Sequence, residues 1–296
     1  MKPVWIVAIV ACVAQPLAGP CAWAQSDAKP KPKFVQSVAK GADIARVADA
    51  KEGERIMVDI AVGSIECTVD DKATETRVAA ELSVDGKDAA DAERRAKLVK
   101  LYAERASDGT IIVNTVFPGA RLPYDSAKVS IIAPPTAEIV LKNMTGSVRA
   151  KGTTGNLRAR TNTGSVVVEN HRGPLDVRAT DGRIDVTGAN ESVQAITTNG
   201  AINLALADGN DQPFKVESRN GAVRVEVGAE FDGVVNMTTT GGAISVVDPA
   251  KRARLSQHSE TRLVAELGAA ASQCEIKTSN GSVTLVAAQA PAKKPE

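Results

Sequence analysis

Residues 161–168 read TNTGSVVV, residues 179–186 read ATDGRIDV and residues 197–204 read TTNGAINL. In each copy a glycine is followed by apolar side chains at the second and fourth positions, with a mostly polar residue between them. Alternation of this kind is typical of a short β-strand, and the glycine indicates a turn that needs a positive φ angle. The copies recur every 18 residues, so the sequence predicts a structural repeat of that length.

The repeat continues towards the C-terminus, and looser units fill the space between its copies. Further copies are SRNGAVRV (218–225), TTGGAISV (239–246) and TSNGSVTL (278–285), and the looser units include RGPLDV (172–177) and NESVQA (190–195). Each period therefore holds two strands. A series of hairpins would not keep one residue class at one offset for so long. We expect an all-β fold, a single-stranded parallel β-solenoid (β-helix) with about 18–21 residues per coil.

Stacked coils would place like side chains above one another at the strand-pairing distance of ~4.8 Å. One internal row should hold Val148, Val166, Ile184, Ile202, Val223, Ile244 and Val283, and a second Val168, Val186, Leu204, Val225, Val246 and Leu285. Thr161, Thr197, Ser218, Thr239 and Thr278 lie three residues before the turn glycines. They are either a hydroxyl ladder at a corner of the coil or ordinary strand-forming residues, and the sequence leaves both readings open.

The remaining chain divides by composition. Residues 1–24 are expected to be a secretory signal peptide cleaved after Ala24, with an uncleaved anchor or a lipoprotein modified at Cys21 as alternatives. The other expected parts are a linker and entry segment (25–54), N-terminal strands with a short helix and hairpin (55–127), solenoid repeats (128–288, with an insertion at 249–272) and a disordered tail (289–296). The pattern predicts a periplasmic, cell-surface or secreted protein whose mature chain has no transmembrane span.

Charge and cysteine content narrow the possible functions. The chain has 36 basic and 35 acidic residues, and Lys2 is the one charged residue in the predicted signal. A neutral mature chain lacks the basic surface of a nucleic-acid-binding protein. Beyond residue 24 the cysteines are Cys67 and Cys274, which fall in inward-facing slots several coils apart. We therefore predict two buried free thiols and no disulfide.

A sequence of motifs carries a resemblance to a known family. GSIECTV (63–69), an acidic, alanine-rich helix with a hairpin, and IIAPPTAEIVLKN (131–143) precede the coils. Over residues 55–288 this order resembles the bacterial putative-adhesin family, a β-helical domain of unknown function. The resemblance implies an exported or membrane-associated binding or structural domain, and it carries no catalytic or binding residues with it.

The residues themselves support three hypotheses. The first is a non-enzymatic binding or structural module whose partner is an unknown envelope protein or surface ligand. Its exposed faces would carry Arg149, Asp185, Asn203 and Arg224 on one side and Arg158, Asp176, Gln194 and Lys215 on the other. Such rows are also what an ordinary solvated surface would carry. The oligomeric state is left open.

The second hypothesis is a polysaccharide-acting β-helix enzyme, for which Asp176, Asp181 and Asp185 form the one local carboxylate cluster. The third is a self-assembling envelope scaffold that pairs through the open ends of its stack. His171 and His258 are far apart in sequence and do not indicate a metal site. We therefore predict no enzymatic activity, no catalytic, cofactor-binding or metal-ligating residues, and no cofactor.

Overall fold

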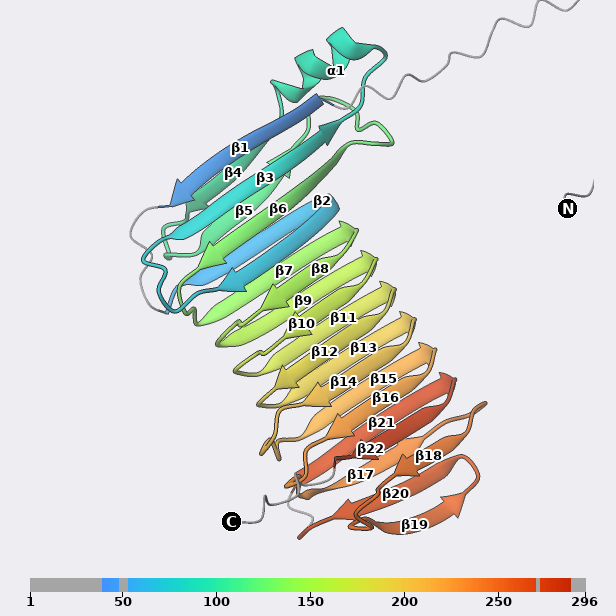
Figure 1. The fold of residues 1–296 in the computed structure, drawn as a ribbon. Coiled ribbons are helices and arrows are strands. Elements are labelled where there is room, and N and C mark those ends of the chain that lie inside the picture. Colours follow the sequence, from blue (N-terminus) through green and yellow to red (C-terminus); the bar gives the residue numbers. More distant parts are fainter. Residues whose placement is uncertain (1–38, 48–52, 270–271, 289–296) are drawn as a thin grey trace, which may run out of the picture. The chain divides into compact units, whose positions relative to one another are not determined.

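The computed structural model describes residues 39–47, 53–269 and 272–288, and its strands lie in two hydrogen-bonded stacks, ladder A and ladder B (Figure 1). The predicted signal peptide and the C-terminal tail lie outside these residues. In spatial order, ladder A consists of β1 (Ala39–Val47), β3 (Thr76–Val84), β6 (Ser126–Ala133), the second half of β2 (Arg55–Val69), β8 (Val148–Lys151), β10 (Val166–Glu169), β12 (Ile184–Ala189), β14 (Ile202–Leu206), β16 (Val223–Val227), β22 (Val283–Ala287) and β18 (Ile244–Val247).

Ladder B faces ladder A across the core. In spatial order it consists of β4 (Lys100–Arg105), β5 (Ile111–Val116), the first half of β2, β7 (Glu138–Thr145), β9 (Asn156–Thr163), β11 (Leu175–Asp181), β13 (Val193–Asn199), β15 (Phe214–Asn220), β21 (Ser272–Asn280), β17 (Gly233–Thr238), β20 (Arg262–Leu267) and β19 (Arg254–Ser259). The all-β prediction is confirmed. The helix α1 (Ala89–Ala96), capped by Asp88, lies inside the segment 55–127, for which a short helix was predicted.

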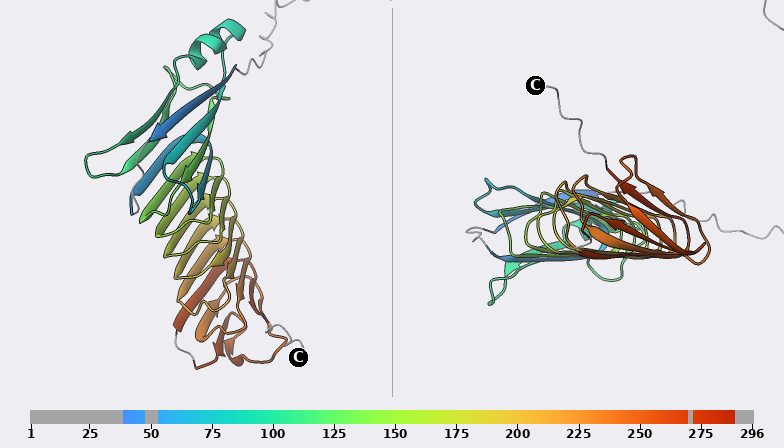
Figure 2. Two further views of the ribbon diagram at one scale, coloured as in Figure 1. Left: turned by 60° about the vertical axis from the view of Figure 1, so that its left-hand side comes forward. Right: turned by 90° about the horizontal axis from the view of Figure 1, so that it is seen from below.

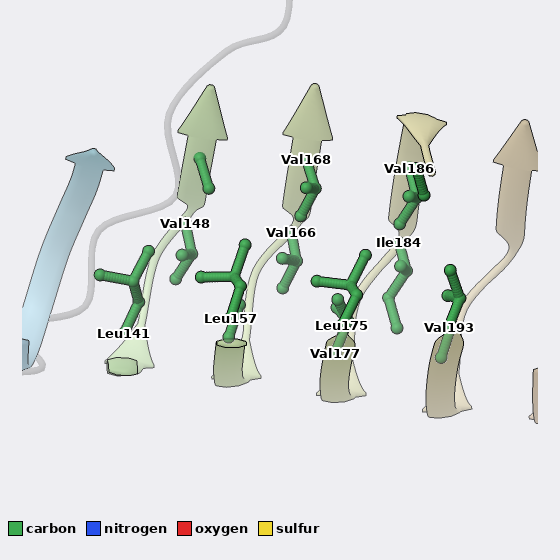
Figure 3. Packing of buried hydrophobic residues seen from close by; sticks show 14 of the residues in the cluster. Leu141, Val148, Leu157, Val166, Val168, Leu175, Val177, Ile184, Val186 and Val193 are labelled. Atoms are coloured by element: carbon green, nitrogen blue, oxygen red, sulfur yellow. The ribbon is translucent and has the colours of Figure 1, made fainter. Parts of the chain in front are cut away.

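Parallel pairing in register gives the stack its core. Val166 pairs with Ile184 and Ile184 pairs with Ile202, so the first predicted row lies inside ladder A at an 18-residue offset. Leu157, Leu175 and Val193 form the corresponding row of ladder B (Figure 3). These side chains are at most 3% exposed, because the two ladders turn their apolar faces towards each other. The offset rises to 21 between Ile202 and Val223.

A stack of glycines marks the corner between ladder B and ladder A. A Cβ atom on Gly182 would overlap the carbonyl oxygen of Gly164, and a Cβ atom on Gly200 would overlap that of Gly182. The expected positive φ occurs at Gly146 and Gly164, whereas the φ angles of Gly182 and Gly200 do not lie in the left-handed region. The prediction of positive φ at every turn glycine is therefore wrong. Close backbone approach between coils is the constraint that all of them share.

The side chains three residues before these glycines form a hydroxyl ladder. Those with a hydroxyl donate hydrogen bonds to the glycine carbonyl oxygens of the neighbouring coil. The donors and acceptors are Thr161 to Gly146, Thr197 to Gly182, Ser218 to Gly200, Thr278 to Gly221 and Thr239 to Gly281, at 2.9–3.1 Å. Asn143 does the same for Gly63 at 2.9 Å. Ala179 occupies this position in one coil and has no hydroxyl to donate.

The order of coils in space differs from their order in sequence at both ends. The strand β2, which belongs to the predicted N-terminal strands, pairs on one side with β5 and β6 and on the other with β7 and β8. Likewise β21 and β22 lie between β15 and β16 on one side and β17 and β18 on the other. Val283 therefore belongs to the predicted row but lies between Val223 and Ile244.

Antiparallel strands close both ladders at the N-terminal end of the stack and ladder B at the other end, whereas ladder A ends there in the parallel strand β18. β3 pairs antiparallel with β6, and β1 pairs antiparallel with β3. At the other end the expected insertion forms the hairpin β19–β20, which pairs antiparallel with β17. Figure 2 shows the hairpin β4–β5 near the N-terminal end and β19–β20 at the far end. Antiparallel closure protects part of the core that a bare coil would expose.

The two cysteines agree with the sequence analysis. Cys67 and Cys274 are free thiols, 0% and 2% exposed. Burial raises the pKa of Cys67 to about 12, and burial also raises the pKa of Cys274. Both therefore act as small apolar core residues.

Candidate binding face

The outward side chains of ladder B form one straight row across the strands. Arg158 pairs in register with Asp176, Asp176 with Gln194, Gln194 with Lys215, and Lys215 with Glu275. Alternation along each strand explains why these residues point away from the core. We call these five residues the polar row. They line an open hollow of about 470 Å³, in which Phe214 and Leu175 form part of the lining.

Ion pairs along this face hold the charged side chains at defined positions. Asp176 accepts from Arg178 Nε at 2.9 Å and lies 3.5 Å from Arg160 Nη2 on the neighbouring strand. Lys215 Nζ lies 3.0 Å from Glu275 Oε2. Each pair lies at the surface and stabilises the fold by less than ~1 kcal/mol. The polar row is therefore ordered, while most of its charge is already balanced by neighbours.

A second hollow, of about 430 Å³, lies at the N-terminal end of the same face. Ile112, Met57 and Val140 pair in register across β5, β2 and β7, and Val140 pairs in turn with Arg158. We call Ile112, Met57 and Val140 the apolar row. It continues the polar row directly. The hairpin turn at 106–110 and the cations Arg55, Lys142, Arg158 and Arg160 form the walls of this hollow.

Ladder A presents a different outward face. Arg149, Val167, Asp185, Asn203 and Arg224 pair in register there. Asn203 donates to Asp185 at 2.8 Å, and Arg149 lies 3.2 Å from Glu169. Both sets of residues that the sequence assigned to exposed faces thus form rows. The two hollows described above lie on ladder B.

The predicted carboxylate cluster does not come together. Asp176 lies on the outer face of ladder B, and Asp185 on the outer face of ladder A. Asp181 lies at the glycine corner, where it accepts a hydrogen bond from Asn199 at 2.6 Å. Asn220 and Asn280 extend that amide ladder, with links of 2.7 and 2.8 Å. The three carboxylates therefore do not form the facing pair that a glycosidase uses.

His171 is a buried structural residue with 0% exposure. Its Nδ1 lies 2.9 Å from the hydroxyl of Thr153, and its Nε2 lies 3.2 Å from the carbonyl oxygen of Pro174. Desolvation by burial lowers the pKa of this imidazole, although nearby carbonyls and Glu191 act in the opposite direction. Nδ1 also lies 3.0 Å from the backbone carbonyl oxygen of Thr153, so a neutral ring can donate to the carbonyl oxygen of Thr153 or to that of Pro174, but not to both. The side chain of His258 lies outside the described residues.

A buried ion pair holds α1 against the loop before β6. Arg95 Nη2 lies 2.7 Å from Asp125 Oδ2, and Asp125 also accepts from the backbone amides of Leu122 and Asp85. Burial alone would raise the pKa of Asp125, but the hydrogen bonds from Arg95 and the two amides outweigh it and lower that pKa. The contact is structural, since all of its groups are satisfied within the fold.

Within the described ranges, no group of three or more His, Cys, Asp or Glu side chains could hold a metal ion. Nor do residues 39–47, 53–269 and 272–288 contain a helix with the length and apolarity needed to cross a bilayer.

Sequence reasoning identified four residues of the polar row, all but Glu275, and missed the apolar row. Val140 and Lys142 stand in the outward slots of EIVLKN (138–143) and alternate with the buried residues Ile139, Leu141 and Asn143. That alternation could be predicted from the sequence. The placement of Met57 between Ile112 and Val140 could not, because it depends on β2 lying between strands that follow it in sequence.

The chain is similar to several known proteins. Residues 121–286 match the family model described as Toastrack DUF4097. Similar solved structures include a putative adhesin from Bacteroides fragilis (13% identity, 84% of this chain and 98% of that chain, TM-score 0.41) and a putative cell adhesion protein from Clostridium sporogenes (12%, 84% and 100%, TM-score 0.33). A third is a putative lipid binding protein from Parabacteroides distasonis (10%, 84% and 97%, TM-score 0.33).

No curated protein matches the sequence. The family match spans more than half of the 296 residues and includes the coils from β7 to β22. It confirms the resemblance drawn from the order of motifs. The chain belongs to the Toastrack DUF4097 family.

Proposed function

We propose that this chain is an exported, non-enzymatic β-solenoid of the putative-adhesin type, which binds a partner protein or surface ligand at the bacterial envelope. The observation that carries this proposal is the polar row, five outward side chains in register across five strands beside an open hollow. A flat, ordered array of this kind suits the recognition of an extended or broad surface. The signal-like pattern of residues 1–24 supports export.

Binding to isolated bacterial envelope tests the proposal. The purified protein is mixed with an envelope fraction at increasing concentration, and the amount that sediments with the envelope is measured. The variant Arg158→Gln/Lys215→Gln should bind more weakly than the wild type. The control Arg149→Gln/Arg224→Gln removes two cations from ladder A. It is matched to the test variant, because each of the four substituted side chains forms one ion pair with a described residue. Absence of saturable binding, or equal loss in both variants, would contradict the proposal.

A self-assembling scaffold is the second candidate, and the strand β18 favours it. Within the described strands, β18 pairs with β22 alone. Ala243 accepts from the amide of Val283, so the alternation of a parallel ladder directs the amides of Ile244 and Val246 away from β22. Sedimentation at rising concentration should then show association that Val246→Pro abolishes. A monomer at every concentration would eliminate this candidate.

A further inference from the structure

The hollow at the apolar row is more selective than the open face beside it. Ile112 is 39% exposed, and Met57 and Val140 are half-buried. With strands ~4.8 Å apart, the three side chains span about 10 Å along the stack. The hairpin turn at 106–110 forms one wall. A narrow apolar strip of this length matches one or two apolar side chains of a ligand and no broad surface.

More cations than carboxylates surround the apolar row. Lys142, Arg55, Arg158 and Arg160 line the hollow with two carboxylates, Asp108 and Glu138. Glu138 is shared by Arg55 and Arg158, at 3.2 and 3.6 Å. Arg160 lies 3.5 Å from Asp176. Lys142 has no ion pair with any described residue. The lining is therefore net positive, and a complementary ligand carries negative charge beside its apolar group.

We propose that this hollow binds an extended peptide segment of a partner protein in which acidic residues flank an apolar side chain. This inference rests on the proposed binding function and names the chemistry of the partner. The apolar side chain lies on Met57 and Val140, and the ligand's carboxylates pair with Lys142 and Arg160. Asp108, which already accepts from the amide and the hydroxyl of Thr110, and Glu138 also line the hollow, and their carboxylates can accept from peptide amides.

The two carboxylates that line the hollow favour a single peptide chain over an anionic bilayer as the ligand. Asp108 and Glu138 line the hollow and would repel anionic lipid headgroups, whereas peptide amides can donate to them. The apolar row is recessed beside the hairpin turn, where one strand reaches it and a flat surface does not. The chain's own C-terminal residues AKKPE (292–296) carry two lysines and one glutamate. The two lysines make this segment a poor match for a positive hollow.

A random peptide library displayed on phage provides the test. Peptides selected on the full chain should be enriched in Asp or Glu next to Leu, Ile, Val or Phe. The best peptide, labelled with fluorescein, is then titrated by anisotropy. Lys142→Gln/Arg160→Gln should weaken its binding about tenfold, the sum of two exposed charge contacts. Val140→Ser should weaken it as well.

Two matched controls report on the opposite face. Arg149→Gln/Lys151→Gln removes two cations from ladder A, and Val167→Ser changes a half-buried outward valine of β10. Both should bind like the wild type, and thermal melts of all variants should coincide. No enrichment, enrichment without acidic residues, or equal effects of test and control variants would overturn the inference.

The outcomes separate this inference from the proposed function. Envelope binding that persists in Lys142→Gln/Arg160→Gln leaves the binding role standing and rejects the peptide hollow. Cosedimentation with phosphatidylglycerol vesicles that this variant abolishes would identify a membrane as the occupant and overturn the peptide. Failure of the wild type to bind envelope at all rejects the proposed function, whatever the library yields.

Discussion

At the scale of single residues, the corner glycines are held by contact between coils. Gly200→Ala should destabilise the fold by about 3 kcal/mol, because its Cβ would overlap the carbonyl oxygen of Gly182 and both coils are fixed by their ladders. Urea unfolding measures the change. Gly241→Ala is the control, since its Cβ would lie 3.3 Å from the flexible side chain of Asn280. If both variants lose the same stability, contact between coils is not the reason for glycine.

The gap in the hydroxyl ladder offers a gain of stability. Ala179 is 7% exposed and lies between Thr161 and Thr197 in ladder B. Ala179→Thr should stabilise the protein by about 1 kcal/mol relative to Ala179→Val, because a hydroxyl there can donate to the carbonyl oxygen of Gly164. The valine variant has the same shape without the donor. Equal thermal midpoints for the two variants would show that the hydroxyls act only as β-formers.

His171 gives the stability a pH dependence of known sign. Burial lowers its pKa in the folded state below the ordinary value of 6.5. Below about pH 6.5 the unfolded chain takes up a proton that the folded chain does not, so stability should fall as the pH falls from 7 towards 5. Denaturant unfolding across this range should show a flatter profile for His171→Gln than for the wild type. A wild-type stability that rises on acidification would contradict the assignment of a neutral ring.

At this scale the sequence was most informative where packing repeats. The internal rows, the free thiols and four residues of the polar row follow from alternation and a fixed offset, and the structure confirms them, except that Ile244 and Val246 on β18 are only partly buried. The φ angles of the glycines could not be predicted from the sequence, because both a close approach between coils and a left-handed turn favour glycine.

At the scale of elements, the hairpin β19–β20 covers the edge of ladder B. Replacing residues 254–267 by a short Gly-Ser linker leaves β17 unpaired on that side and uncovers Val235 and Met237, which are both fully buried. An open, apolar edge associates with other edges. The weight-average molar mass from light scattering should therefore rise more steeply with concentration for this variant than for the wild type. A monomeric, fully folded deletion variant would show that the hairpin is not protective.

Sequence reasoning recognised the repeat strands, α1 and the β4–β5 hairpin, but not the antiparallel cap strands β1 and β3. β3 alternates almost perfectly between buried and exposed positions. Its sequence TRVAAELSV is also compatible with a helix, because alanine, glutamate and leucine favour one. Tertiary pairing with β6 decides the outcome.

At the scale of the whole molecule, the last described strands are an internal part of the stack. A chain that ends after Gly268 lacks β21 and β22, so β15 and β16 lose the strands that separate them from β17 and β18. We expect this truncation to abolish a single cooperative thermal transition, whereas a chain ending after Ala288 should melt like the full chain. Circular dichroism measures both. A cooperative melt of the shorter chain near the wild-type midpoint would contradict the observed order.

Periodicity cannot reveal that order. Every coil presents the same classes of side chain at the same offsets, so β22 can pair equally well with β16 or β18, and in the structure it pairs with both. The hollow at the apolar row was hidden for the same reason. It exists because β2 lies between β5 and β7, and nothing in a repeated pattern distinguishes that neighbour from another.

The internal position of β21 and β22 also has a consequence for how the protein is made. A ribosome delivers residues 233–267 before residues 272–287 exist, so β17 and β20 can pair early while the place beside β15 stays vacant. The final strands must then enter between two assembled parts. We expect the newborn chain to stay incompletely folded until residues 272–287 have been synthesised.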